Sequence, residues 1–163
     1  MSMILHLNAE AIRQLDLTPG QTLMEQLLQS PATAAQQVQC HIDYPRALDD
    51  PRELSEIPEI RLWFVRFDAH YPWMPYFLDW RQGELARYAA MLVPHKFHPQ
   101  EGIEYHPEAL EIFLYSKIFV LMRWMKQHQV GGVADLKNMA LIFGYEIEDG
   151  FLALWEQDLC PPS

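Results

Sequence analysis

The densest group of metal-ligand residue types in the chain lies between residues 95 and 106. It consists of His95, His98, Glu101, Glu104 and His106. Histidine and carboxylate side chains bind zinc and non-haem iron, but two histidines three residues apart share a face only on a helix. Prolines at positions 94 and 99 interrupt a helix there. We therefore interpret the group as a surface or inter-strand cluster of side chains, and a small metal-dependent enzyme that uses the His95–His106 region is the alternative function.

Carboxylates of the kind that exchange protons with a substrate occur in the middle of the chain, at Asp68, Asp79 and Glu84. Four arginines lie in the same region, at positions 61, 66, 81 and 87, so salt bridges between neighbouring elements are the simpler interpretation. Neither Ser55 nor Ser116 lies in the GxSxG motif that marks a serine nucleophile. The sequence therefore predicts no catalytic residues and a protein that is not an enzyme.

The two cysteines, Cys40 and Cys160, lie far apart in the sequence and form no CxxC motif. An iron–sulfur cluster usually needs four thiolates, so one copy of the chain cannot supply them. We expect no bound cluster, no metal and no other cofactor. This use of cysteine is typical of a reducing compartment.

Two neighbouring segments have the composition of a protein-binding surface. Residues 43–59 are acidic, and residues 71–80 are rich in aromatic side chains and proline. Acidic side chains steer a basic partner, and buried aromatic side chains supply much of the affinity. The candidate contacts are Asp49, Asp50, Glu53, Tyr71, Trp73, Tyr76 and Trp80. The simpler interpretations are a solvated loop for the acidic segment and core packing for the aromatic one.

One long helix is predicted at Pro107–His128, and the rest of the chain is organised around it. Acidic residues lie in its first turn and basic residues near its end, as the helix dipole favours, and Gly131 and Gly132 follow it. Apolar residues cover most of its faces, which indicates a buried helix with Trp124 in the core.

The remaining patterns predict an α+β fold with a small, mostly antiparallel sheet and helices packed on it. Aromatic and β-branched residues favour a strand at Ile60–Asp68. We expect Glu84–Val93 to pair with it as a second strand, although its alanines leave a helix as the alternative. Shorter strands are expected at Met3–Leu7, Val38–Ile42 and Ile103–Tyr105, and helices at Asn8–Leu15, Gln21–Gln29, Val133–Phe143 and Gly150–Gln157.

Length and charge limit the classes of function. The 163 residues fit a single domain, 1–163. The formal net charge of −10 disfavours nucleic acid and anionic membranes as partners, because both select a basic surface. Glu111, Lys117 and Arg123 inside the long helix make its insertion into a bilayer costly, so no integral membrane segment is predicted. The first residues lack the pattern of a signal or transit peptide, which indicates the cytoplasm.

Three segments have patterns more specific than their secondary structure requires. They are Tyr71–His95, Tyr105–Phe113 and Asp135–Gly144, and the run LARYAAMLVPH at residues 85–95 is the most specific part. Together they resemble the chlororespiratory reduction 6 family of cyanobacteria and chloroplasts. The resemblance covers roughly Ile57–Tyr145 and nothing in the first fifty residues, so we expect a variable region at 1–50 and a core at 57–158.

The resemblance implies an assembly factor that acts by binding another protein. Members of the family help to build the photosynthetic NAD(P)H dehydrogenase-like complex of chlororespiration and cyclic electron transport. They act in maturation of its ferredoxin-like iron–sulfur subunit I, which is the implied partner. The resemblance also implies a chaperone-like role and, together with the missing transit peptide, a cyanobacterial protein in the cytoplasm. It supplies no catalytic residues that could be assigned here.

Overall fold

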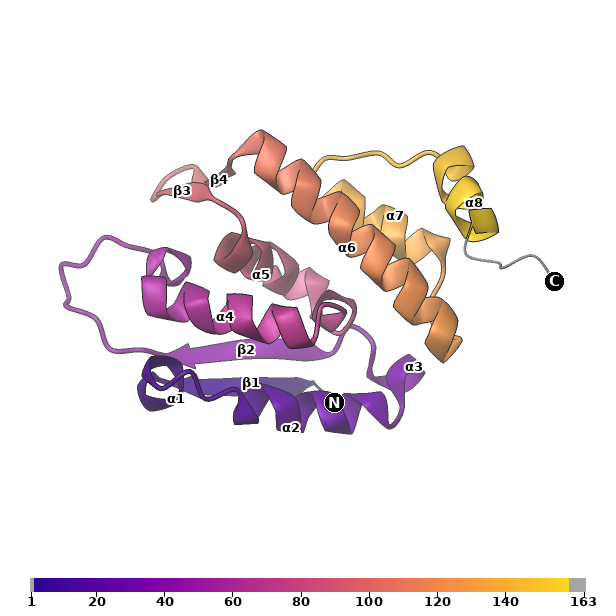
Figure 1. The fold of residues 1–163 in the computed structure, drawn as a ribbon. Coiled ribbons are helices and arrows are strands. Elements are labelled where there is room, and N and C mark those ends of the chain that lie inside the picture. Colours follow the sequence, from indigo (N-terminus) through magenta and orange to yellow (C-terminus); the bar gives the residue numbers. More distant parts are fainter. Residues whose placement is uncertain (1, 159–163) are drawn as a thin grey trace.

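The computed structural model describes residues 2–158, and its elements form an α+β fold, as the sequence predicts (Figure 1). In chain order they are β1 (Met3–Asn8), α1 (Ala9–Arg13), α2 (Thr18–Leu28), α3 (Pro31–Ala34), β2 (Val38–Asp43), η1 (Leu54–Glu56), α4 (Pro58–His70), η2 (Met74–Tyr76), η3 (Trp80–Gln82), α5 (Glu84–Leu92), β3 (His95–His98), β4 (Gly102–Tyr105), α6 (Pro107–His128), α7 (Val133–Ile142) and α8 (Asp149–Asp158). The sheet β1–β2 and α1–α3 lie at the bottom of Figure 1, α4 and α5 lie above them, and α6–α8 lie on top.

The sheets differ from the expected one in extent and direction. Among the described residues, β1 and β2 form one two-stranded sheet, and β3 and β4 form another. The β3–β4 pair is antiparallel, but β1 and β2 run parallel, with Met3 opposite Val38 and Asn8 opposite Asp43. A parallel pair needs a crossover connection, and α1, α2 and α3 provide it.

The strand predicted at Ile60–Asp68 is wrong, because these residues form helix α4. The buried residues of α4 are Ile60, Trp63, Phe64 and Phe67, each at most 2% exposed. Their spacing of three and four residues is that of one helical face. Aromatic content suggested a strand, but the period of the apolar residues decides the structure, and Pro58 occupies the first helical turn.

The second predicted strand is also wrong, since Glu84–Leu92 forms helix α5, the alternative that its alanines favoured. Leu85, Tyr88 and Ala89 are buried on it. Helices α4 and α5 lie against each other, so packing between two helices replaces the expected pairing of two strands. The ring of Tyr88 meets that of Phe64 edge to face, with centroids 6.0 Å apart.

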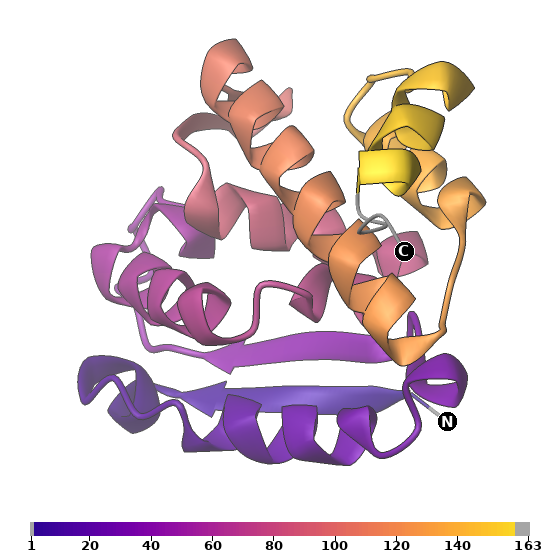
Figure 2. The ribbon, with the colours of Figure 1, turned by 45° about the vertical axis from the view of Figure 1, so that its right-hand side comes forward.

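Helix α6 has the predicted bounds, and it crosses over α4 and α5 (Figure 2). His106 caps its start, where the ring Nδ1 accepts a hydrogen bond from the Ala109 N–H at 3.3 Å. It ends at His128, and the next residue, Gln129, adopts the left-handed conformation (φ 55°) before the chain reaches the glycines expected to stop the helix. Trp124 is 4% exposed, which confirms its place in the core.

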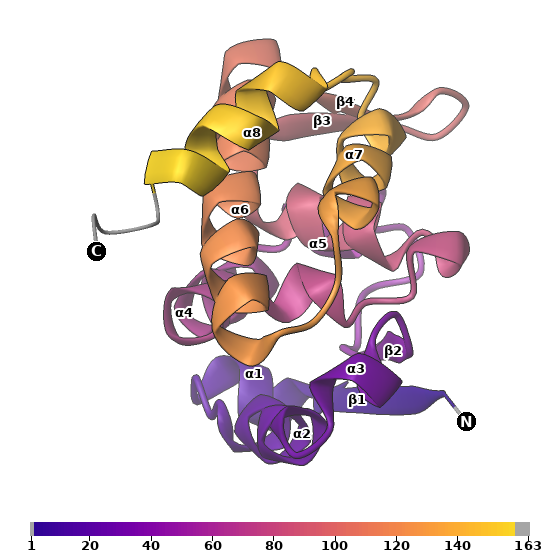
Figure 3. The same ribbon diagram turned by 90° about the vertical axis from the view of Figure 1, so that its right-hand side faces the viewer.

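A single hydrophobic cluster joins the two halves of the chain. It contains Leu7 of β1 and Leu27 of α2, together with Leu114 and Leu121 of α6 and Met139 of α7. Helix α7 lies beside α6, and α8 crosses the upper part of α6, far from the β1–β2 sheet (Figure 3). The first fifty residues therefore share a core with the rest of the chain.

Candidate interaction surface

The aromatic segment 71–80 is packed against α6. Tyr76 is 4% exposed, whereas Tyr71, Trp73 and Trp80 are half-buried. Trp73 stacks on Trp124 with ring centroids 6.2 Å apart and an angle of 10° between the planes. Of the four candidate aromatic residues, Tyr76 thus belongs to the core, and the other three offer only part of their surface to a partner.

A hydrogen bond within the aromatic segment and one from α6 hold it in place. The Trp80 indole N–H donates to the Pro75 carbonyl at 2.7 Å. The Lys117 ammonium donates to the Pro72 carbonyl at 3.3 Å and also binds Asp68. Both prolines restrict the backbone, so the exposed parts of the aromatic side chains are held in a fixed arrangement.

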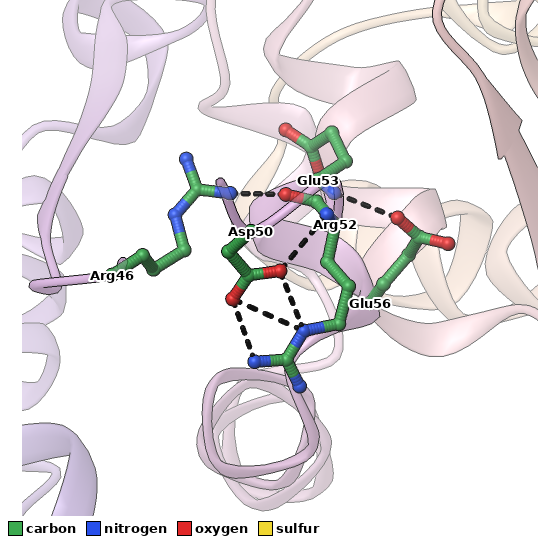
Figure 4. A network of polar contacts seen from close by, with 5 residues as sticks. All are labelled: Arg46, Asp50, Arg52, Glu53 and Glu56. Atoms are coloured by element: carbon green, nitrogen blue, oxygen red, sulfur yellow. Dashed lines mark hydrogen bonds and ion pairs between the residues drawn. The ribbon is translucent and has the colours of Figure 1, made fainter. Parts of the chain in front are cut away.

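The acidic segment forms a loop that is held by internal hydrogen bonds and an ion pair. Only some of its carboxylates are therefore available to a partner. Two oxygens of Asp50 bind the Arg52 guanidinium, with a shortest distance of 2.8 Å between Oδ2 and Nη2. These hydrogen bonds lower the pKa of Asp50 to about 2, so the pair stays charged through mildly acidic pH. Glu53 caps η1, and its own N–H donates to the Glu56 carboxylate at 2.7 Å (Figure 4). Asp49 is exposed.

The two candidate segments are not neighbours, because they flank opposite ends of α4. The acidic segment precedes Pro58, and the aromatic segment follows His70 (Figure 1). A helix of this length separates its ends by about 20 Å at 1.5 Å per residue. The structure therefore brings Asp49, Asp50 and Glu53 together at one end of α4. It brings the aromatic residues together at the other end.

The histidine cluster does not converge on one point. His95 and His98 lie on β3 three residues apart, so their side chains leave opposite faces of the strand. The ring of His95 is bound at both nitrogens, by the Val93 carbonyl at 3.0 Å and the Ser55 hydroxyl at 2.9 Å. Within residues 2–158, no three or more His, Cys, Asp and Glu side chains are grouped so that they could hold a metal ion. Cys160 lies outside the described residues.

The three carboxylates considered for acid–base chemistry serve separate structural roles. Asp68 binds Lys117 and accepts a hydrogen bond from the Tyr88 hydroxyl at 2.6 Å. Asp79 caps η3, and Glu84 binds Arg87 at 3.2 Å. The sequence did not reveal Lys117 as the partner of Asp68, because the two residues come from different helices 49 positions apart.

A small cavity lies between β2, α4 and α5. Its lining residues are Cys40, Ile42, Phe64, Glu84, Arg87, Tyr88 and Met91. The side chain of Glu84 is 7% exposed, and loss of hydration raises the pKa of its carboxyl group. Loss of hydration, followed by the nearby charge of Glu84, raises the pKa of the Cys40 thiol, which therefore stays protonated and weakly nucleophilic.

No helix among the described residues is long and apolar enough to cross a membrane.

No solved structure matches the chain. The family model described as chlororespiratory reduction 6 matches residues 7–154. This match is wider than the range of the sequence resemblance, and it includes most of the N-terminal region. Because the match extends over most of the sequence, the chain belongs to the chlororespiratory reduction 6 family.

Proposed function

We propose that this protein is an assembly factor for the chlororespiratory NAD(P)H dehydrogenase-like complex, and that it acts by binding the ferredoxin-like iron–sulfur subunit I in the cytoplasm of a cyanobacterium. The family match over residues 7–154 is the observation that carries the proposal. The geometry supports binding over catalysis, since His95, Asp68 and Glu84 are engaged in structural contacts. The role is chaperone-like, because the protein holds its partner during maturation.

A partner of ordinary size can reach both candidate segments. A standard interface of about 800 Å² on each side is about 30 Å across, which exceeds the length of α4. We infer that the acidic loop guides a basic partner, while the exposed parts of Tyr71, Trp73 and Trp80 add contact area. Asp49, Asp50 and Glu53 differ in role, because the last two maintain the loop.

Affinity purification of the tagged protein from a cyanobacterium, followed by mass spectrometry, tests this function. We expect subunit I to be enriched, and we expect a strain without the protein to accumulate less of the assembled complex. Unchanged amounts of the complex in that strain, with no subunit of the complex retained by the tagged protein, would refute the proposed function.

Neutralising Asp49 is expected to slow association with subunit I by a few-fold at low salt. Asp49 is exposed, and no hydrogen bond or ion pair within residues 2–158 engages it, so Asp49→Asn removes charge without breaking the loop. Steering acts on the association rate, so the dissociation rate should change little and the salt dependence should weaken. Stopped-flow kinetics at several salt concentrations measure both rates. Glu146→Gln, an equal charge change at another exposed site, is the control. Equal slowing by both variants would contradict a local role for Asp49.

Replacing Trp73 with alanine is expected to speed dissociation by a factor equivalent to about 2 kcal/mol or more. The indole is half-buried, so the same change also removes its stacking on Trp124 and lowers stability. Tyr76→Ala is the matched control, because Tyr76 is buried beside the same tryptophan at 5.3 Å between ring centroids. Binding kinetics are compared at a temperature where thermal unfolding shows both variants to be folded. If the two variants lose stability alike and bind normally, the aromatic segment serves only the core.

A further inference from the structure

A tight turn in the acidic loop displays one leucine to solvent. The Asp50 N–H donates to the Ala47 carbonyl at 3.0 Å, which places Leu48 and Asp49 at the two central positions of a β-turn. The side chain of Leu48 is fully exposed, at 108% of its reference area. We call residues Ala47–Asp50 the Leu48 turn. Among the side chains that the structure describes, the other exposed large apolar ones reach 69% at most, at Ile112.

The Leu48 turn is braced on the side that leads to η1. Asp50 accepts hydrogen bonds from the Arg52 backbone N–H at 3.1 Å and from its guanidinium group. Arg46, which precedes the turn, donates to the Arg52 carbonyl (Figure 4). These contacts close a ring around the turn. Ordering the loop in the free protein lowers the entropic cost of binding through it.

Both ends of the loop are attached to the body of the protein. The Arg13 guanidinium of the α1 helix lies over the Tyr44 ring, 5.2 Å from its centroid. At the other end, buried Ser55 is joined to His95 on β3 at 2.9 Å. The histidine that the sequence offered as a metal ligand therefore fixes the base of this loop.

The charges of the loop indicate the chemistry of its partner. Residues 43–59 carry six acidic and two basic side chains. Both arginines, Arg46 and Arg52, form hydrogen bonds within the loop, while Asp43, Asp49 and Glu59 are exposed. An acidic loop is repelled by anionic lipid headgroups, so a leucine at its tip suits a protein better than a membrane.

We propose that the Leu48 turn is the anchor of the docking surface: Leu48 enters an apolar pocket on the partner protein, and basic side chains around that pocket meet Asp49. This inference rests on the proposed function, because subunit I is the partner in which the pocket is sought. Hot spots lie in well-packed, desolvated pockets surrounded by contacts that exclude water, and Leu48 in such a pocket would have this arrangement, although leucine is less frequent at hot spots than tryptophan, tyrosine or arginine.

Titration calorimetry with purified subunit I tests the anchor. Leu48→Ala is expected to weaken binding by roughly 10- to 100-fold, the range that corresponds to full burial of a leucine side chain. Leu48→Met keeps an apolar side chain of similar volume and should bind within a few-fold of the unchanged protein. Leu141→Ala, at an exposed leucine on α7, is the control and should have no effect. All three variants should unfold at the same temperature as the unchanged protein, because neither leucine is buried.

The outcomes separate this proposal from the proposed function. If the unchanged protein binds subunit I and Leu48→Ala binds within threefold of it, or if Leu141→Ala weakens binding as much, the anchor is refuted and the function stands. If the unchanged protein does not bind subunit I, a photo-crosslinking residue at position 48 is used in cells. A crosslink to another subunit of the complex supports the anchor and refutes subunit I as partner, whereas no crosslink to the complex refutes both. Leu48-dependent binding to anionic vesicles would also overturn the anchor.

Discussion

Replacing Lys117 with alanine is expected to lower the free energy of unfolding by about 3–5 kcal/mol, as for other buried ion pairs that lose one partner. Lys117 is 5% exposed, and its ammonium group binds the Asp68 carboxylate and the Pro72 carbonyl. The alanine variant leaves Asp68 without its cation and leaves a cavity beside α6, where the lysine side chain was packed. It also releases α6 from the start of the aromatic segment. Urea denaturation measures the loss, and a loss below about 1 kcal/mol would show that water replaces the ammonium group easily.

Two further variants identify the cause of this loss. The double variant Lys117→Met with Asp68→Asn removes both charges, keeps apolar volume and retains an acceptor for the Tyr88 hydroxyl. It should therefore recover much of the stability that the alanine variant loses. Lys117→Met alone should remain destabilised, because Asp68 keeps its charge. If the single and double methionine variants are equally stable, the charge of Asp68 is not the cause.

The Lys117 pair also predicts how stability depends on pH. Removal of the ammonium group from water lowers its pKa below the usual 10.5, and the Asp68 charge opposes this shift. The folded state therefore loses the proton before the unfolded chain does. The cost of burying the charge is present at neutral pH, and it diminishes as the pH rises through the lowered pKa toward 10.5. Relative to the double variant, the unchanged protein should gain stability across that range.

The elements predicted correctly are those in which the signals at the ends and the spacing of the apolar residues indicate the same structure. Helix α6 has a proline at its start, suitable charges at both ends and an apolar pattern, and its bounds were predicted correctly. Asn8 likewise caps α1, as its side chain accepts a hydrogen bond from the Ala11 N–H at 2.8 Å. In α4 the residue types and the period disagreed. Aromatic residues favour strands only where they fit a pleated sheet, and here burial on one helical face outweighed that preference.

The candidate surface could be predicted only in part, because it depends on which distant residues meet. Sequence identified the acidic and aromatic segments, but it could not show that a 13-residue helix separates them. Nor could it show that Trp124 covers one face of Trp73. No sequence pattern distinguishes Leu48, since it is one leucine in an acidic loop. Its importance depends on the turn and the Arg52 pair, which are visible only in the folded chain.

Replacing Trp124 with alanine is expected to lower the free energy of unfolding by about 3–5 kcal/mol. The indole lies at the centre of an aromatic cluster, with ring centroids 5.3 Å from Tyr76, 5.5 Å from Phe77 and 6.2 Å from Trp73. The substitution removes a buried side chain from α6 and leaves these three rings without a common neighbour. Aromatic pairs contribute about 0.5–1.5 kcal/mol each beyond area burial, so the loss should lie toward the upper end of the range.

Phenylalanine at the same position distinguishes packing from hydrogen bonding. Within residues 2–158 the buried indole N–H of Trp124 has no hydrogen-bond acceptor, so Trp124→Phe removes an unpaired polar group and keeps an aromatic ring. It should therefore cost far less than Trp124→Ala. A double-mutant cycle with Trp73→Ala then measures the coupling across the stack. A coupling of about 0.5–1.5 kcal/mol would show that contact with Trp124 stabilises the position of Trp73. If the losses in free energy of unfolding are additive, the aromatic segment keeps its arrangement without this contact.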